Sequence, residues 1–172
     1  MGKGEEVFRE VLKFSDYKKK NILKKHTKRV ADFCEELAEI WNNESPNKVD
    51  VELLLDAAWL HDVGKIHNKN KHEKKKTIKK VIDDIYSKEE FNVLTMIISN
   101  HKGKFNPKKY KEESAILRLC DKVDKFHKGD KKDARRICHK TLMKIERKKH
   151  FNVEDMIRFY KFYLEYQNNF MK

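Results

Sequence analysis

A His-Asp pair directly after an apolar run is the part of this chain best suited to chemistry. His61 and Asp62 follow the run 57–60, and Gly64 and Lys65 come next. Adjacent residues on a helix point about 100° apart, so the two side chains cannot face one core, and burying either without a partner is costly. At a helix end both can converge on a cation, and Gly64 is typical of the left-handed residue that ends a helix. A metal ion is the obvious candidate for that cation.

A divalent metal needs three or more ligands, so the pair requires partners from elsewhere in the chain. His26 shares one helical face with apolar residues of the segment 22–37. Asp121 lies four residues after an apolar position of the run 116–120, where an unpaired carboxylate would be strongly disfavoured. His101 ends another apolar run. Metal-binding groups therefore lie on the inner faces or at the ends of different helices, as in metal sites in the cores of helical bundles.

The order His26, His61-Asp62, Asp121 resembles the H…HD…D signature of the HD-domain phosphohydrolase superfamily. HDVGK at 61–65 is similar to the HDxGK version found in its HD-GYP and related branches, and the match runs from about 22 to 124. The resemblance implies an all-helical fold around one metal or a close metal pair, which hydrolyses a phosphate ester or anhydride. No GYP element follows His101, so the cyclic-di-GMP phosphodiesterase assignment does not carry over.

The resemblance also implies which residues hold metal. The set implied for a first ion is His26, His61, Asp62 and Asp121. Two-metal members of the superfamily add histidines between the pair and the last Asp, and His72 and His101 lie at such places, with Asp62 able to bridge two ions. His101 is expected to be a ligand because it ends a buried-looking helix. His72 is either a ligand or a solvated residue in a lysine-rich stretch, and His67, in a polar loop, is not expected to bind metal.

The ligand types indicate which metals fit and what they do. Imidazoles and carboxylates suit Mn, Fe, Co, Ni or Zn, and Mg is also accepted. Water on such a metal loses a proton near neutral pH and becomes a nucleophile, while the metal neutralises phosphoryl oxygens. Asp62 and Lys65 are the expected catalytic residues, and Lys65 is the first choice for binding phosphate. Arg118 is a second choice unless it faces solvent. Asp124 either orients a ligand or pairs with a nearby lysine.

Composition sets the limits of the architecture. At 172 residues the chain is expected to be one domain, with a metal-site core at about 16–128 and a helical extension at 131–172. No run approaches the ~20 apolar residues of a membrane span. The N-terminus has no hydrophobic signal region, which predicts a cytoplasmic protein. Three isolated cysteines are expected to be reduced core thiols.

Hydrophobic periodicity and the placement of Gly and Pro predict an all-α bundle of about seven or eight helices. The expected ranges are 5–14, 16–41, 50–61, a helix from about 72 to 86, 87–100, 112–126, 131–149 and 152–170. Asp16, Asp50 and Ser87 are the expected N-caps, the last with Glu90 three residues on. The strongly aromatic final helix is expected to pack over the bundle. A wall for a nucleobase or a homodimer surface is the alternative.

The net charge of +13 predicts attraction to polyanions. Lysine clusters at 69–76 and 102–109 flank His72 and His101, where they could steer anions into the site. Acidic residues are interspersed and no known nucleic-acid-binding motif is present. The expected function is a metal-dependent phosphohydrolase acting on a nucleotide or a related phosphorylated metabolite. The alternatives are a phosphodiesterase for RNA ends, cyclic nucleotides or dinucleoside polyphosphates, and a non-catalytic nucleic-acid or regulatory module that retains the metal.

Overall fold

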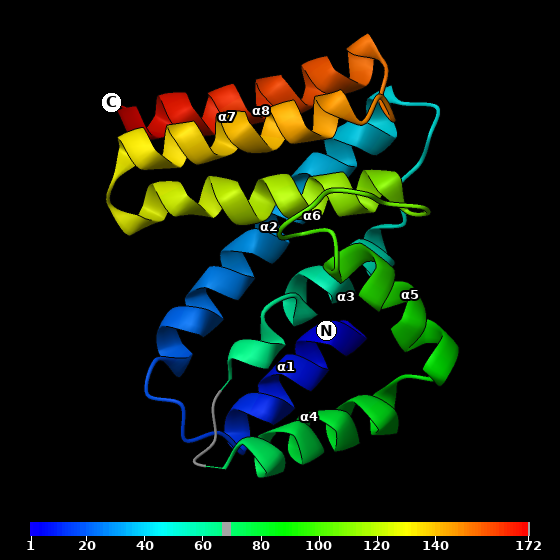
Figure 1. Cartoon of the computed structure of the whole chain (residues 1–172), viewed down its shortest axis with the longest axis vertical. Helices are drawn as coiled ribbons and strands as arrows, with labels where there is room; N and C mark the ends of the chain where they lie inside the picture. The colour runs from blue at the N-terminus through cyan, green and yellow to red at the C-terminus, as the bar shows by residue number, and fades with distance from the viewer. Residues whose placement is uncertain (67–69, 172) are drawn as a thin grey trace.

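The computed structural model describes residues 1–66 and 70–171, and this part of the chain is helical without a single strand. His67, which the sequence places in a polar loop, lies outside the described residues. Eight α-helices follow one another in this part (Figure 1): α1 Lys3–Lys13, α2 Lys20–Glu44, α3 Val51–Leu60, α4 Lys71–Ile85, α5 Lys88–Ile98, α6 Lys111–Val123, α7 Lys131–Arg147 and α8 Val153–Met171. The all-α prediction is confirmed.

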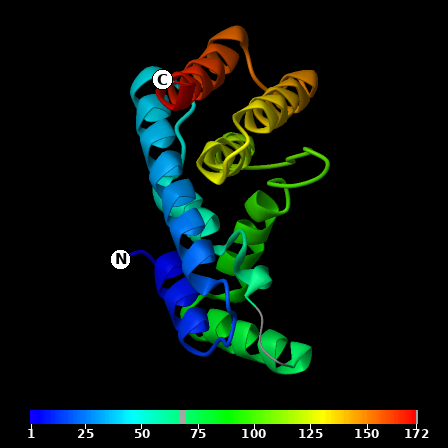
Figure 2. The ribbon, with the colours of Figure 1, turned by 90° about the vertical axis from the view of Figure 1, so that its left-hand side faces the viewer.

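The long helix α2 organises the molecule. Helices α6, α7 and α8 lie side by side at one end of α2, while α1, α3, α4 and α5 gather around its other end (Figures 1 and 2). Helix α6 contacts α2, α3 and α5 on one side and α7 and α8 on the other. Helices α2, α3 and α6 therefore meet in the middle of the molecule.

Helix α6 is buried along nearly its whole length, which is the position expected of a helix without a continuous polar face. The core around it is apolar and includes Leu37, Leu54, Leu117 and Tyr163, all fully buried. Four polar or charged residues of α6 are buried as well: Glu113, Ser114, Arg118 and Asp121. Because buried polar and charged groups are costly without partners, these four side chains need hydrogen-bond or ionic partners inside the protein.

The final helix packs over the bundle as expected. The ring of Phe159 lies 4.9 Å from that of Trp41 on α2, measured between centroids, and both side chains are fully buried. The outer face of α8 leaves Val153, Ile157 and Leu164 exposed. The homodimer alternative for this face stays a prediction.

Asp56 fixes helix α3, which carries the His-Asp pair at its end. The backbone N–H of Gly4 donates to Asp56 Oδ1 at 2.7 Å, and the Tyr86 hydroxyl donates to Asp56 Oδ2 at 2.7 Å. A Cβ on Gly4 would lie 2.6 Å from the Asp56 Cα, so only glycine allows α1 to approach α3 this closely. One carboxylate thus ties together α1, α3 and the residue that follows α4.

Two of the predicted N-caps are confirmed. The Asp50 side chain accepts a hydrogen bond from the Leu53 N–H at 3.0 Å at the start of α3. Ser87 and Glu90 form a capping box at the start of α5. These caps satisfy N–H groups that have no partner inside a helix.

The predicted start and end of α2 are wrong. The helix begins at Lys20 rather than Asp16, and Lys19 at its N-cap position makes no capping hydrogen bond with its side chain. It also continues to Glu44, into the segment expected to be a loop. Helix ends depend on a few weak interactions, which apolar periodicity does not record.

Gly64 does not take the left-handed conformation expected of it. Within the described residues, the glycines with positive φ are Gly103 and Gly129. Helix α3 ends at Leu60, and Val63–Lys65 form a short 3₁₀ turn in which the Lys65 N–H bonds the Asp62 carbonyl at 2.9 Å. The backbone therefore continues into a 3₁₀ turn after the His-Asp pair, and no left-handed glycine ends the helix there.

Two further expectations concern the chain as a whole. The three cysteines are buried free thiols at Cys34, Cys120 and Cys138, as predicted. Among the described helices, none combines the length and the apolar character that crossing a membrane requires.

Candidate metal centre

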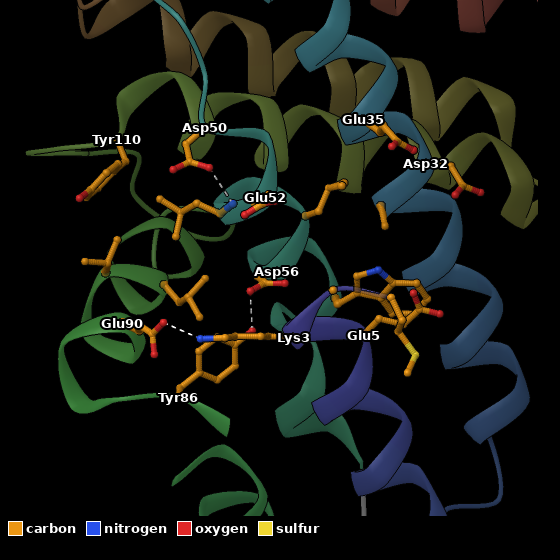
Figure 3. Close-up of a pocket in the computed structure, with 18 of the residues that line it drawn as sticks. Lys3, Glu5, Asp32, Glu35, Asp50, Glu52, Asp56, Tyr86, Glu90 and Tyr110 are labelled. Carbon is orange, nitrogen blue, oxygen red and sulfur yellow. Dashed lines mark hydrogen bonds and ion pairs between the residues drawn. The ribbon is translucent and has the colours of Figure 1, made fainter. Parts of the chain in front are cut away.

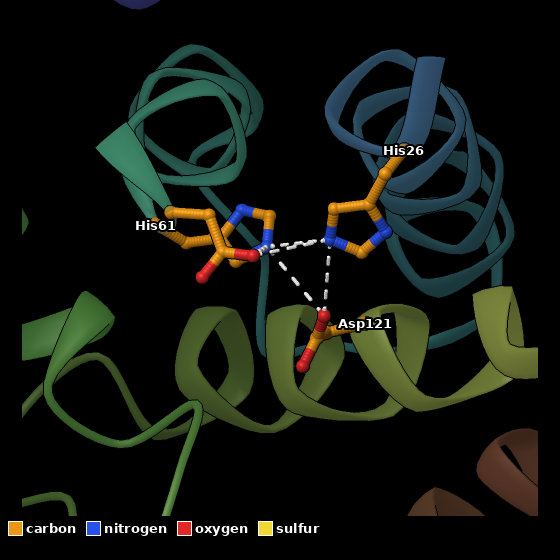
Figure 4. Close-up of side chains that lie close together, drawn as sticks. His26, His61 and Asp121 are labelled. Atoms are coloured by element: carbon orange, nitrogen blue, oxygen red, sulfur yellow. Dashed lines mark hydrogen bonds and ion pairs between the residues drawn. The ribbon is translucent and has the colours of Figure 1, made fainter. Parts of the chain in front are cut away.

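Four buried side chains from three helices converge where α2, α3 and α6 meet. His26 projects from the second turn of α2, His61 follows the last turn of α3, and Asp121 lies on α6 (Figure 4); Asp62 is the residue after His61. Each is at most 7% exposed. Together they are the one group in the described residues whose His, Cys, Asp or Glu atoms lie close enough to share a metal ion. The structure thus brings together the four residues that the resemblance implied for a first ion.

The spacing of the four ligand atoms fits a small divalent ion. His26 Nε2 lies 3.2 Å from His61 Nε2, 3.3 Å from Asp62 Oδ2 and 3.4 Å from Asp121 Oδ1. His61 Nε2 lies 3.5 Å from each of the same two carboxylate oxygens. Atoms at this separation can share one centre about 2.0–2.2 Å from each, the usual length of bonds from zinc-like metals to nitrogen and oxygen.

Hydrogen bonds on the far side of each ring prepare the histidines to bind metal. His61 Nδ1 lies 2.6 Å from the Ala58 carbonyl oxygen, which can only accept, so Nδ1 carries a proton. His26 Nδ1 lies 2.6 Å from Asp124 Oδ2 and donates in the same way. A neutral imidazole protonated at Nδ1 presents the lone pair of Nε2. In both rings this lone pair is directed at the cluster, which is the arrangement that a metal ligand needs.

Asp124 supports His26 from behind. Its carboxylate is fully buried and also accepts from Arg29, with Nε 2.5 Å from Oδ1 and Nη2 3.2 Å from Oδ2. Burial raises the pKa of Asp124, but His26 and Arg29 lower it more. Its cationic partner is thus an arginine rather than the lysine considered as an alternative, and its place fits the orienting role expected from the sequence.

The two carboxylates of the cluster raise the pKa of the neighbouring His26. Burial lowers the pKa of His26, but the carboxylates of Asp121, Asp124 and Asp62 raise it more, to about 10. Burial raises the pKa values of Asp62 and Asp121, and the surrounding histidines and lysines lower both well below their usual range. A divalent ion would therefore replace the proton on His26 while satisfying both carboxylates.

His101 faces the second oxygen of Asp62. Its Nδ1 lies 2.5 Å from the Ile98 carbonyl, so Nε2 again carries the lone pair. This Nε2 is buried, lies 3.8 Å from Asp62 Oδ1 and has no hydrogen-bond partner among the described residues. A buried polar atom without a partner is costly. An unpartnered Nε2 fits the expected role of His101 as a metal ligand, which stays a prediction.

His72 is not drawn into the cluster. It lies in the first turn of α4 and is exposed, and its backbone N–H bonds the Asn70 side chain at 2.8 Å. No contact of its imidazole with the four ligands is found in the described part of the chain. Its role as a ligand of a second ion stays a prediction.

Three lysines from three segments contact the carboxylate ligands. Lys65 Nζ donates to Asp62 Oδ2, Lys102 Nζ donates to Asp62 Oδ1 at 3.1 Å, and Lys122 Nζ donates to Asp121 Oδ2. The sequence predicts Lys65 here and predicts Lys102 as part of the lysine cluster 102–109, whereas Lys122 is not predicted. Lys102 and Lys122 each follow a candidate ligand by one residue, but lysine and arginine make up 41 of 172 residues, so this adjacency does not distinguish them.

Arg118 does not face solvent, and both of its terminal nitrogens, Nη1 and Nη2, donate to backbone carbonyls. The side chain is 3% exposed, and it donates to the carbonyls of Asn100 at 2.7 Å, Gly103 at 2.6 Å and Lys102 at 3.4 Å. It holds the loop between α5 and α6 against α6. A phosphate could bind these nitrogens only by displacing the carbonyls, and a role of Arg118 in binding substrate stays a prediction.

A wide, open groove of about 970 Å³ lies away from the cluster, and none of the four ligands lines it. Its labelled lining residues in Figure 3 are mostly acidic: Glu5, Asp32, Glu35, Asp50, Glu52, Asp56 and Glu90, with Lys3 as the labelled cation. Negative charge is thus concentrated on a different part of the surface from the lysines around the ligands.

The fold and the cluster together define an all-helical protein with a buried histidine–carboxylate site suited to a metal ion. A family model of the HD domain matches residues 23–128, which is more than half of the chain. No curated protein and no solved structure matches the chain significantly. The chain belongs to the HD domain family, whose members are in general metal-dependent hydrolases. The family match contains all four clustered ligands and ends before α7.

Proposed function

We propose that this protein is a metal-dependent phosphohydrolase that cleaves a phosphate ester or anhydride of a nucleotide or a related phosphorylated metabolite. The observation that supports it most directly is the buried set of four ligands, in which the two histidine Nε2 atoms lie 3.2 Å apart and 3.3–3.5 Å from one oxygen of each carboxylate, with three lysines at the carboxylates. Metal ligands alone are compatible with a structural ion. Flexible cations beside the ligands are what binding an anionic group at the ion requires.

Each residue has a distinct part in this proposal. His26, His61, Asp62 and Asp121 would hold a divalent ion, which supplies an activated water and offsets charge on the phosphoryl oxygens. Lys65, Lys102 and Lys122 bind and orient the phosphate, because their side chains are long enough to turn from the carboxylates to a substrate. These lysines also offset charge on the departing oxygen.

Asp62 would help to hold a second ion as well as the first in this proposal. Its Oδ2 belongs to the four-atom cluster, and its Oδ1 faces the unpartnered Nε2 of His101. The two oxygens of one carboxylate thus face two neighbouring sites. The native metal is proposed to be Mn, Fe, Co, Ni or Zn, with Mg also compatible.

Hydrolysis of a panel of phosphate compounds tests this function. The panel covers nucleoside mono- and triphosphates, dinucleoside polyphosphates, cyclic nucleotides and RNA ends, each with Mn, Co, Ni, Mg or Fe. We expect metal-dependent release of phosphate or nucleotide, and a loss in Asp62→Ala of more than about a hundredfold, the upper range for losing a residue that only orients a ligand. Asp32→Ala, which removes an exposed carboxylate of α2, is the matched control.

The outcome also separates an enzyme from a binding module. Circular dichroism must show that Asp62→Ala is folded. If folded wild-type protein cleaves nothing in the panel, and RNA binds with a salt-sensitive affinity that Asp62→Ala retains, the enzyme proposal is wrong and the high net charge serves nucleic-acid binding instead.

A further inference from the structure

A second cationic site lies between the α5–α6 loop and α7. A pocket of about 380 Å³ is lined by Gly103, Lys104, Phe105, Lys144, Arg147 and Lys148. Four of these six residues are cations, and none of the four pairs with a carboxylate anywhere in the described structure. Unpaired cations around one concave pocket favour an anionic ligand.

The pocket adjoins the metal centre through one short stretch of chain. Lys102 donates to the metal ligand Asp62, whereas Lys104, two residues on, lines the pocket. The backbone limits the distance between their Cα atoms to about 7 Å. Gly103, between them, has its carbonyl held by Arg118 at 2.6 Å. Arg118 therefore anchors a loop that places Lys102 at the metal centre and Lys104 in the pocket.

Helix α7 supplies the other wall of the pocket. Lys144 Nζ approaches the Gly103 carbonyl at 3.5 Å. Loss of hydration and repulsion from Arg118, Lys140 and Lys122 lower the pKa of Lys144. Other cations thus surround Lys144, and a bound anion would relieve the repulsion.

The charges around the metal ligands also favour a substrate with more than one phosphate group. A divalent ion would offset Asp62 and Asp121, which leaves the ammonium groups of Lys65, Lys102 and Lys122 unmatched. A phosphomonoester carries at most two negative charges, so it leaves a surplus of positive charge even before the pocket is counted. A substrate with linked phosphates matches the site and the pocket together.

We infer that the pocket between the loop and α7 binds a second phosphate group of the substrate, so that the substrate carries at least two phosphates. The inference rests on the proposed function and adds to it the class of substrate, a phosphoanhydride or polyphosphate. Lys144 and Arg147 lie on α7 and Lys148 follows its last residue, so these three cations lie beyond the residues 23–128 that match the HD family model.

Calorimetric binding of inorganic tripolyphosphate and orthophosphate, with Mg²⁺ in excess over the ligand, tests the inference without relying on catalysis. The test variant is Lys144→Gln/Arg147→Gln. The control, Lys80→Gln/Lys88→Gln, removes the same charge from exposed positions on α4 and α5. We expect the test variant to bind tripolyphosphate roughly five- to tenfold more weakly than wild type, with orthophosphate binding unchanged. The control should bind both ligands as wild type does.

Two results would overturn the inference: tripolyphosphate affinity unchanged in the test variant, or reduced equally in test and control variants. Hydrolysis then separates this failure from that of the proposed function. If wild type cleaves panel compounds but the test variant keeps the same KM for a nucleoside triphosphate, the pocket assignment fails and the enzyme stands. If nothing is cleaved but the binding difference is found, the pocket stands and the proposed function fails.

Discussion

At the scale of single residues, hydrogen bonds behind the ligands determine what the ligands can bind. The Ala58 and Ile98 carbonyls hold the protons of His61 and His101 on Nδ1, and the Asp124 carboxylate does so for His26. Each ring then presents Nε2 to the site. Of these three acceptors, Asp124 alone is charged, and it is also held by an arginine, which makes it the most informative one to change.

We predict that Asp124→Asn weakens metal binding roughly 10- to 100-fold, the usual effect of changing a residue that orients a ligand. Asparagine keeps an oxygen acceptor for His26 Nδ1, but it loses the negative charge and leaves Arg29 without its partner. Competition with a metal-binding dye measures the affinity. Asp32→Asn, on the exposed side of α2, is the control. Equal affinities in the two variants would show that Asp124 does not support the ligand.

The four ligands were predictable because each is a polar residue on an otherwise apolar stripe or at its end. His26 and Asp121 stand out in this way even without a structure. Lys102 and Lys122 do not stand out, because lysine and arginine account for 41 of 172 residues. A lysine that follows a ligand cannot be told from the other lysines of the chain. The role of Arg118 was not predictable either, since the carbonyls it binds come together only in the folded loop.

At the scale of elements, two anchors position the parts that carry the site. Asp56 ties α3 to α1 and to Tyr86 at the end of α4, while Arg118 fixes the α5–α6 loop onto α6. The first anchor places the His-Asp pair, and the second places His101 and Lys102. Asp56 is half-buried and Arg118 is buried, and each binds at least one backbone group, so losing either side chain leaves its partners without their hydrogen bonds.

We predict that Arg118→Lys lowers the free energy of unfolding by about 1–3 kcal/mol, because one ammonium group cannot serve carbonyls of three residues in the geometry of a guanidinium. Urea denaturation measures the change. Arg136→Lys is the control, because Arg136 forms an exposed ion pair with Asp133. A loss no larger than that of the control would mean that the loop is held by other contacts.

Element positions were largely predictable, but their ends were not. Asp50 and Ser87 start helices as predicted because a capping side chain acts locally, on an N–H three residues away. Asp16 has the same chemistry, yet α2 starts four residues later. Gly64 likewise has the freedom to be left-handed, but a 3₁₀ turn forms there. In both cases tertiary packing decides between local options that the sequence leaves open.

At the scale of the whole molecule, the two ends of α2 are joined by one continuous core. The two tryptophans report on them separately: Trp41 packs against Phe159 of α8, and Trp59 lies 5.5 Å from Phe8 of α1 between ring centroids. A single domain would unfold at both ends together. The chain length predicts one domain in which the metal-site core and the helical extension unfold together. This prediction can be tested directly.

We predict one cooperative transition in each of the single-tryptophan variants Trp41→Phe and Trp59→Phe. In each variant, urea unfolding followed by the fluorescence of the remaining tryptophan should coincide with unfolding followed by circular dichroism, since helical signal reports on the whole chain. Fluorescence and dichroism midpoints that differ within one variant would instead indicate that α7 and α8 unfold apart from the metal-site core.

The central claim is that His26, His61, Asp62 and Asp121 form a metal centre. Its most direct test is the metal content per chain, measured by mass spectrometry after purification without chelator and exposure to Mn²⁺ or Ni²⁺. We predict at least one ion in wild type, loss of that ion in Asp121→Ala with the helical signal retained, and loss of only a second ion in His101→Ala. Wild-type protein that retains no metal, or Asp121→Ala that retains as much as wild type, would contradict the account.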